Sequence, residues 1–216
     1  MKWSTEAWNK IAPIYDKIIN LRFNQELSNG TLEKDKFIFY LAQDAYYLLD
    51  FGRTLSAIAA KLVQADQVLM YNGFASGAIA AERNLHESYF KEFGLDEKIV
   101  PSPSTLLYTN YILNQASYAN VEVALAAVLP CFWIYKAVGD HILKQQTGNN
   151  PYKRWIDMYA GEDFAESVHR AINLTDFFAE KSGEDLRQKM FDSFEMATRM
   201  EWLFWESAYE KEQWKI

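Results

Sequence analysis

The sequence predicts an all-α fold, a single-domain helical bundle of about eight helices spanning residues 1–216. Breakers are rare, because only 9 glycines and 5 prolines occur among 216 residues, and long helices can therefore form without interruption. Between the breakers, apolar residues recur with the period of a helix, and no segment shows the alternation and β-branched enrichment of a strand. Half of the residues are hydrophobic, which is enough material for one substantial core.

Short turn-forming segments mark the ends of the predicted helices. These segments are Asn29-Gly30, Gly94, Pro101-Ser102-Pro103, Gly148-Asn149-Asn150-Pro151, Ala160-Gly161 and Ser182-Gly183. The helices between them are expected at 4–22, 33–64, 67–92, 104–117, 120–147, 151–158, 163–181 and 184–212. Ser104 and Ser182 stand where N-caps are expected, and Asp185 follows Ser182 at the spacing of a capping box. Residues 38–62 and 120–138 are apolar almost all round, which is typical of central helices.

Charge and composition exclude several classes of function. The net charge is −7 and the pI is about 5.1, and no basic stripe is present, so we expect no nucleic-acid partner. No stretch reaches the ~20 uninterrupted apolar residues of a membrane span, and the N-terminus lacks the apolar core of a signal peptide. A single cysteine excludes an intrachain disulfide and fits a reducing compartment. We therefore expect a cytoplasmic protein with no membrane partner.

The single thiol occupies an unusual place. Cys131 follows Pro130 inside an apolar helical run, where a proline frees a backbone carbonyl and bends the helix. Tyr135 lies four residues further on, and hence on the same helix face. This arrangement could present a buried nucleophile to a pocket. Alternatively, Cys131 is a small core hydrophobe, which is the common role of a free cysteine.

Two carboxylates interrupt apolar helices and need a partner if they are buried. Asp44 lies in such a run, with Tyr47 one turn further on the same face. Its simplest explanation is a hydrogen bond to a neighbouring tyrosine.

Glu201 and Glu206 lie on the last helix and are five residues apart, so one should face inward and the other outward. Phe204 shares the face of Glu201. The apolar surroundings favour a functional role for Glu201, and the alternative is an ion pair with Arg199 or another cation.

Several aromatic residues allow more than one interpretation. Tyr108 and Tyr159 lie near helix ends, where a tyrosine often packs its ring and hydrates its hydroxyl. Trp205, Tyr209 and Trp214 could form an oligomer interface or close the domain's own core.

A metal site is disfavoured. Glu82 and His86 lie four residues apart on one helix, but the helical di-iron pattern spaces glutamate and histidine by three residues and uses two such pairs. No glycine-rich phosphate loop, cysteine-rich zinc spacing or nucleophile elbow occurs either.

Several segments, spread over most of the chain, resemble one protein family when their order and spacing are taken together. They are Leu41-Ala42-Gln43-Asp44-Ala45-Tyr46-Tyr47-Leu48, Pro101-Ser102-Pro103-Ser104 with Tyr108-Thr109, Leu129-Pro130-Cys131-Phe132-Trp133-Ile134-Tyr135, Trp155-Ile156-Asp157-Met158-Tyr159-Ala160-Gly161 and Glu201-Trp202-Leu203-Phe204-Trp205. In order and spacing they resemble the TenA family, also called thiaminase II or aminopyrimidine aminohydrolase. The segment around Cys131 is the most specific, and it resembles the branch of the family that carries the cysteine. Glu82 and His86 also fit the family's pattern, which weakens the metal interpretation further.

The resemblance implies a haem-oxygenase-like helical fold without haem, usually assembled as a homotetramer. It implies a thiamin-salvage hydrolase without metal or organic cofactor. The substrate would be thiamin or its breakdown product 4-amino-5-aminomethyl-2-methylpyrimidine, and the product would be the corresponding hydroxymethylpyrimidine.

By the same resemblance, Cys131 is the nucleophile, Glu201 the acid/base carboxylate, and Asp44 the carboxylate that binds the ring amino edge. The remaining substrate-binding residues would be Tyr47, Tyr108, Tyr135, Tyr159 and Phe204. Two alternatives stay open: a non-catalytic pyrimidine-binding or regulatory protein, and a metal-dependent oxidase on the same scaffold.

Overall fold

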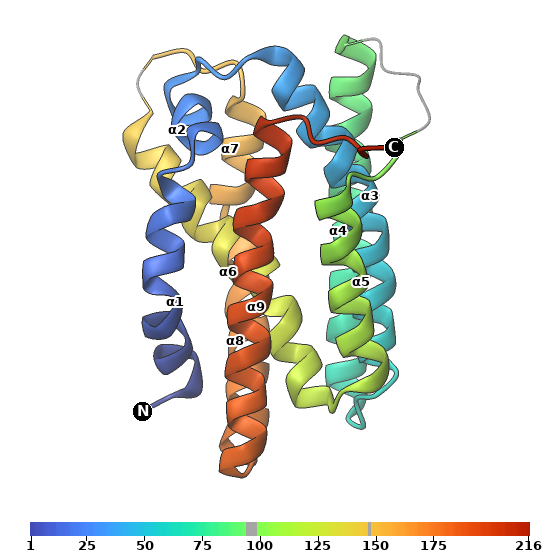
Figure 1. Ribbon diagram of the computed structural model, residues 1–216. Helices are drawn as coiled ribbons and strands as arrows, with labels where there is room; N and C mark the ends of the chain where they lie inside the picture. The colour runs from blue at the N-terminus through green and yellow to red at the C-terminus, as the bar shows by residue number, and fades with distance from the viewer. Residues whose placement is uncertain (94–98, 147) are drawn as a thin grey trace.

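The computed structural model describes residues 1–93, 99–146 and 148–216, apart from the side chains of 81, 82, 84–86 and 88–93. Within these ranges the chain forms nine α-helices and no strand (Figure 1). The helices are α1 (Trp3–Ile19), α2 (Arg22–Asn29), α3 (Lys34–Ala59), α4 (Ala65–Phe93), α5 (Pro103–Tyr118), α6 (Val121–Gln145), α7 (Lys153–Ala160), α8 (Glu162–Glu180) and α9 (Glu184–Tyr209). The predicted all-α class is confirmed, and each of the eight predicted segments coincides with one helix.

The ninth helix, α2, was not predicted. The predicted helix 4–22 ends at Ile19, because the chain turns at Asn20 and α2 begins at Arg22. The Asn24 side chain donates to the carbonyl of Ile18 at 2.8 Å and so satisfies one of the open acceptors at the end of α1. Gly30 then ends α2 with a φ of 70°, a left-handed conformation that glycine adopts without steric cost. No glycine or proline marks the turn at Asn20, so the sequence carries no local signal for it.

The start of α5 differs from the predicted one. Ser102 is the N-cap, and its hydroxyl accepts a hydrogen bond from the Thr105 N–H at 3.2 Å. Ser104, the predicted cap, lies inside the first turn, and its N–H donates to a carboxylate oxygen of Glu212 at 2.9 Å. The indole of Trp214 donates to a carbonyl just before the helix. The segment that follows α9 therefore lies against the beginning of α5 (Figure 1).

The start of α9 also differs, by one residue. Gly183 is the N-cap, and the predicted capping box of Ser182 and Asp185 does not form. The Ser182 hydroxyl instead donates to the carbonyl of Phe178 at 2.9 Å. This contact satisfies a carbonyl at the end of α8, where helical acceptors have no intrahelical donor, so the serine completes the preceding helix and not the following one.

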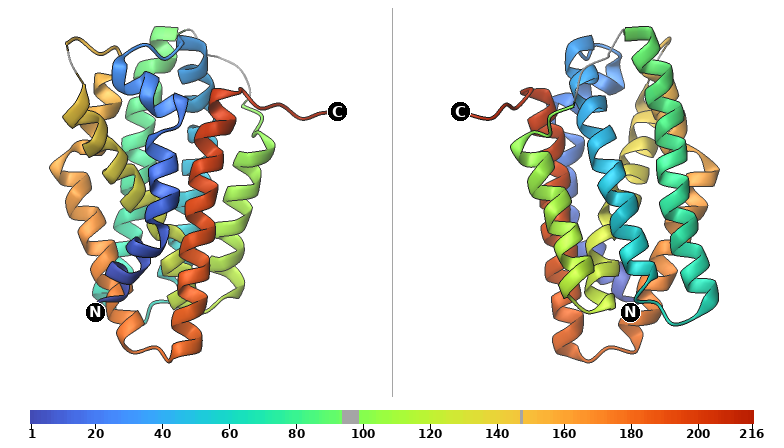
Figure 2. Two further views of the ribbon diagram at one scale, coloured as in Figure 1. Left: turned by 60° about the vertical axis from the view of Figure 1, so that its left-hand side comes forward. Right: turned by 90° about the vertical axis from the view of Figure 1, so that its right-hand side faces the viewer.

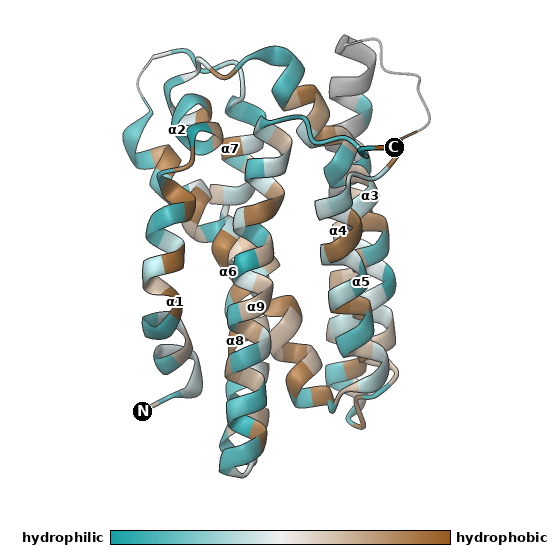
Figure 3. Cartoon of the chain, viewed as in Figure 1, coloured by the Kyte–Doolittle hydropathy of each residue, from teal (hydrophilic) through white to brown (hydrophobic). Residues whose placement is uncertain are grey.

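The central element is α6, which packs against α9, α7, α8 and α5. Its length and apolarity would suffice for a membrane span, and 72% of its most apolar window is buried inside the fold. Apolar stretches along α6 are visible in Figure 3. Trp205 is fully buried and belongs to the core, whereas Trp214 is 45% exposed. The apolarity of α6 therefore matches its position at the centre of the bundle.

The pair α3 and α4 flanks this centre. The two helices run side by side along much of their length (Figure 2). The two helices approach each other closely at Gly52. A side chain would not fit there, because a Cβ built on Gly52 would lie 2.7 Å from the Cδ1 of Ile79. The helix α3 also packs against α5 and α9, which brings the residues of three helices toward α6.

Candidate active site

One face of α3 forms the first wall of the site. Tyr40, Asp44, Tyr47 and Phe51 follow one another at helical spacing, and all four are buried. Asp44 and Tyr47 were predicted site residues. Tyr40 and Phe51 were not, although they continue the same stripe one turn before Asp44 and one turn after Tyr47.

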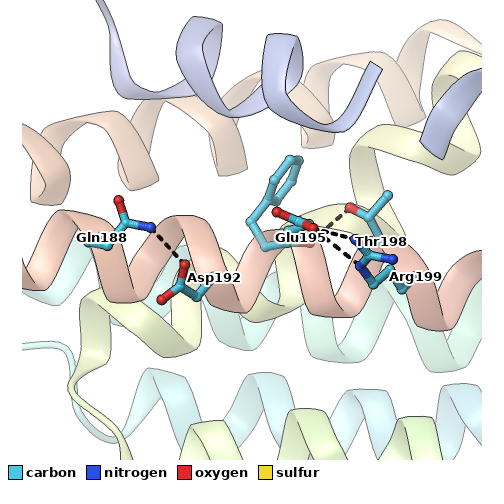
Figure 4. Close-up of polar contacts among 6 residues, drawn as sticks. Gln188, Asp192, Glu195, Thr198 and Arg199 are labelled. Atoms are coloured by element: carbon cyan, nitrogen blue, oxygen red, sulfur yellow. Dashed lines mark hydrogen bonds and ion pairs between the residues drawn. The ribbon is translucent and has the colours of Figure 1, made fainter. Parts of the chain in front are cut away.

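Glu201 on α9 is fully buried and is the carboxylate of its pair that faces inward. Its Oε1 accepts a hydrogen bond from the Tyr108 hydroxyl of α5 at 2.7 Å. Its Oε2 has no hydrogen-bond partner among the described residues. The proposed ion pair with Arg199 is wrong, because Arg199 bonds Glu195 at 2.6 Å on the exposed side of α9 (Figure 4).

The environment of Glu201 favours its neutral form. Burial raises the pKa of Glu201 from 4.5 to about 8, the hydrogen bond from Tyr108 opposes this shift, and the charge of Asp44 adds to it. The carboxyl group therefore carries a proton at neutral pH. Because Oε1 already accepts the Tyr108 hydrogen, the proton belongs on Oε2, which has no hydrogen-bond partner in the part of the chain that the structure describes.

Cys131 on α6 lies close to the same cluster. Burial and then the charge of Cys131 raise the pKa of Tyr47, and Tyr108 and Glu201 add to this effect. Burial, Glu201 and Cys131 likewise raise the pKa of Tyr108. The rings of Tyr47 and Tyr108 are 4.8 Å apart between centroids. These two tyrosines therefore interact with both the thiol and the carboxylate.

Aromatic rings enclose the remaining side. Tyr135 lies between Tyr159 and Trp205, with centroid distances of 4.8 Å and 4.7 Å. Phe204 packs against Tyr47 at 5.7 Å. Burial raises the pKa of Tyr135, and Tyr40, Asp44, Glu201 and Tyr159 contribute further. The predicted residues Tyr135, Tyr159 and Phe204 thus lie in the same cluster as the carboxylates.

A cavity of about 590 Å³ opens next to this cluster. Residues of α3, α4, α6, α7 and α8 surround it, together with Gly161. Its lining residues are Leu48, Phe51, Gly73, Phe74, Gly77, Ala78, Cys131, Phe132, Asp157, Met158, Tyr159, Gly161, Glu162, Asp163, Phe164 and Ser167. Of the predicted site residues, only Cys131 and Tyr159 line the cavity, and the other six are packed behind its wall. Cys131, at 9% exposure, is the point where the cavity and the buried cluster meet.

Sequence reasoning missed most of the cavity wall. Phe51 could have been found as the next residue of the α3 stripe, and Gly73 and Gly77 as two small residues one turn apart. Phe74 and Phe164 carry no local signal, since only the packing of α4 and α8 around α6 places them. The side chains of Glu82 and His86 lie outside the described residues. Across the described part of the chain, no group of three metal-ligating side chains occurs.

The sequence of this chain is similar to a known protein family and to several known proteins. The family model described as TENA/THI-4/PQQC matches residues 8–211. A protein from Bacillus subtilis named aminopyrimidine aminohydrolase is 34% identical, over 99% of this chain and 92% of its own length. A protein of the same name from Halalkalibacterium halodurans is 30% identical, over 99% of this chain and 98% of its own.

Solved structures show the same fold. The crystal structure of a TenA homologue from Pyrococcus furiosus matches with a TM-score of 0.90 at 22% identity, covering 95% of this chain and 99% of its own. A protein from Silicibacter described as a TenA family transcription regulator matches with a TM-score of 0.89 at 24% identity, covering 96% of each chain. The family model and the two curated relatives span almost the entire sequence, and the chain therefore belongs to the TENA/THI-4/PQQC family.

Proposed function

We propose that this protein is a thiamin-salvage hydrolase that acts on an aminopyrimidine and uses Cys131 as nucleophile and Glu201 as acid and base. The observation that carries the proposal is the buried carboxyl of Glu201, whose pKa is raised to about 8 and whose Oε2 has no hydrogen-bond partner among the described residues, in a cluster that also contains the only thiol. The two relatives named aminopyrimidine aminohydrolase support the substrate class.

The role of Glu201 follows from the chemistry of the ring. An aminopyrimidine is electron-rich and resists nucleophilic attack until one of its ring nitrogens is protonated. A carboxylic acid with a pKa of about 8 is protonated at pH 7 and can donate to such a nitrogen through Oε2. The resulting carboxylate can later take the proton back, because the two states differ little in free energy near neutral pH.

The role of Cys131 is covalent. Its thiolate adds to a ring carbon while Glu201 protonates the ring, and a carbon–sulfur bond forms. The ring electrons then expel the substituent of the exocyclic methylene: the C–N bond breaks, and an ammonium group leaves as ammonia or the thiazolium leaves as the neutral thiazole. Water adds to the methylene and releases a proton to the solvent. Finally the carbon–sulfur bond breaks, and the ring proton returns to Glu201.

The surrounding groups would hold the ring. Asp44 accepts hydrogen bonds from the ring amino edge in this proposal, and the rings of Tyr47, Tyr108, Tyr135, Tyr159 and Phe204 enclose it. Aromatic rings stack on a flat ligand and exclude water. Because all of these side chains except that of Tyr159 lie behind the cavity wall, substrate must enter beside Cys131, and the tyrosine rings turn to admit it.

One experiment tests the proposal. The protein is incubated separately with thiamin and with the aminomethylpyrimidine, and formation of the hydroxymethylpyrimidine is followed by chromatography. We expect product from at least one substrate and none from Cys131→Ala. Equal turnover by Cys131→Ala would contradict the covalent role. Tight product binding without turnover by the wild type would instead support the non-catalytic pyrimidine-binding alternative.

A further inference from the structure

A chain of three hydrogen-bonding side chains lies behind Tyr135. The Nε1–H of Trp155 donates to the Tyr40 hydroxyl at 3.1 Å. The Tyr40 hydroxyl donates to the Tyr135 hydroxyl at 3.5 Å. All three residues are buried: Trp155 and Tyr40 are 0% exposed, and Tyr135 is 2% exposed. They come from α7, α3 and α6, so the chain links three helices around the site.

The two hydrogen bonds give this chain of side chains a direction. An indole N–H is a donor only, whereas a phenol can donate or accept. The oxygen of Tyr40 therefore accepts from Trp155, and in the structure the Tyr40 hydroxyl donates to Tyr135. The Tyr135 oxygen then accepts, and its own hydrogen must point away from Tyr40.

The surroundings of Tyr135 include both acidic side chains of the site. Tyr159 and Trp205 pack against the ring of Tyr135. Asp44 and Glu201 are both near enough to influence the protonation of Tyr135 electrostatically. Two acidic side chains with oxygens that can accept a hydrogen bond therefore lie near the Tyr135 hydroxyl.

We propose that Trp155 and Tyr40 are positioning residues that orient the Tyr135 hydroxyl as a hydrogen-bond donor toward the carboxylates and the bound pyrimidine. This inference rests on the proposed function, which places Tyr135 against the substrate. Removal of the Tyr40 hydroxyl leaves Tyr135 free to turn its hydrogen away from the substrate. The consequence is a loss of alignment in the reactive complex, without a loss of the binding pocket.

The test uses Tyr40→Phe and a matched control, Tyr152→Phe. Tyr152 is also buried, and its hydroxyl donates to the carbonyl of Leu32. Tyr40→Phe loses the hydrogen bonds with Trp155 and Tyr135, and Tyr152→Phe loses the one with Leu32, so both variants should unfold at lower urea concentration than the wild type. We expect kcat of Tyr40→Phe to fall roughly 2- to 12-fold, the range for one neutral hydrogen bond, with KM nearly unchanged. Tyr152→Phe should keep the wild-type kcat.

A double-mutant cycle separates a positioning role from a structural one. In a Tyr135→Phe background, Tyr40→Phe should have no further effect on kcat, because the hydroxyl that it orients is gone. Trp155→Phe, which removes the first donor, should reproduce the kcat loss and provides a second variant if Tyr40→Phe fails to fold.

The outcomes distinguish this inference from the proposed function. Multiplicative effects of Tyr40→Phe and Tyr135→Phe, or equal kcat values for Tyr40→Phe and Tyr152→Phe in an active wild-type background, overturn the orienting role and leave the proposed function standing. A wild-type protein that turns over neither substrate overturns both.

Discussion

Replacement of Glu201 by glutamine should make the protein more stable at neutral pH and inactive at the same time. The carboxyl has a pKa of about 8 in the fold against an ordinary value of 4.5. Between these values the folded protein holds a proton that the unfolded chain has released, so rising pH favours unfolding. The full stability is present below pH 4.5, and the free energy of unfolding falls by about 1.4 kcal/mol per pH unit above it. At pH 7 the loss reaches about 3 kcal/mol.

Glutamine cannot ionise, so Glu201→Gln escapes this loss. The assay is urea unfolding followed by circular dichroism between pH 5 and pH 8. We expect the variant's advantage in free energy of unfolding to grow by about 3 kcal/mol across this range. Glu206→Gln, on the same helix but partly exposed, is the control and should follow the wild type. An advantage of Glu201→Gln that stays constant with pH would refute the reasoning.

The same variant should lose turnover, because an amide cannot shuttle a proton. We expect kcat to fall at least about 100-fold while affinity for the hydroxymethylpyrimidine changes less, the pattern of an interaction that matters in the transition state. Glu206→Gln should keep its activity. If Glu206→Gln were the inactive variant, the proton donor would be the wrong glutamate.

Three further variants probe the thiol, the tyrosines and the packing of the site. Cys131→Ser should fold normally and lose at least about 100-fold in turnover, because a hydroxyl is a poorer nucleophile than a thiolate; near-normal turnover in steady-state assays would end the covalent mechanism. Tyr47→Phe should keep its stability and lose activity, because only the hydroxyl near Cys131 is removed. Unchanged kinetics would show that Tyr47 contributes only to the packing of the core. Gly139→Ala should lower thermal stability and raise KM, since its Cβ would lie 2.8 Å from the backbone carbon of Tyr159. Unaltered KM and melting temperature would show that α7 yields without disturbing the site.

The fold class and the positions of the long helices were predictable because apolar periodicity and rare breakers are local properties. The boundaries that failed depend on side-chain contacts from outside the helix concerned. The turn at Asn20 is stabilised by Asn24 from the next helix, and the Ser104 N–H is satisfied by Glu212. Neither contact follows from the apolar periodicity that predicted the helices.

The residues of the candidate site also fall into those that local sequence predicts and those that it does not. Asp44 and Glu201 could be recognised because a carboxylate in an apolar helix needs a hydrogen-bonding partner or a functional role. Tyr47 and Tyr135 could be recognised because each lies one helical turn from such a candidate residue. Phe74 and Phe164 could not, since they reach the cavity only through the packing of α4 and α8. The homotetramer and the single domain stay predictions, for which light scattering and limited proteolysis are the tests.

The contact between Glu212 and Ser104 also bears on the order in which the molecule can be assembled. The two residues are 108 positions apart, and the Tyr108–Glu201 hydrogen bond joins α5 to α9 across 93 positions. During synthesis, α5 emerges long before either partner exists, and its first turn stays without this carboxylate until Glu212 has left the ribosome. Contacts between residues so distant in sequence form late, because closing a long loop costs entropy before any contact repays it. The proton-donating carboxyl of Glu201 and its partner Tyr108 are therefore brought together only after the 93 residues between them have been made.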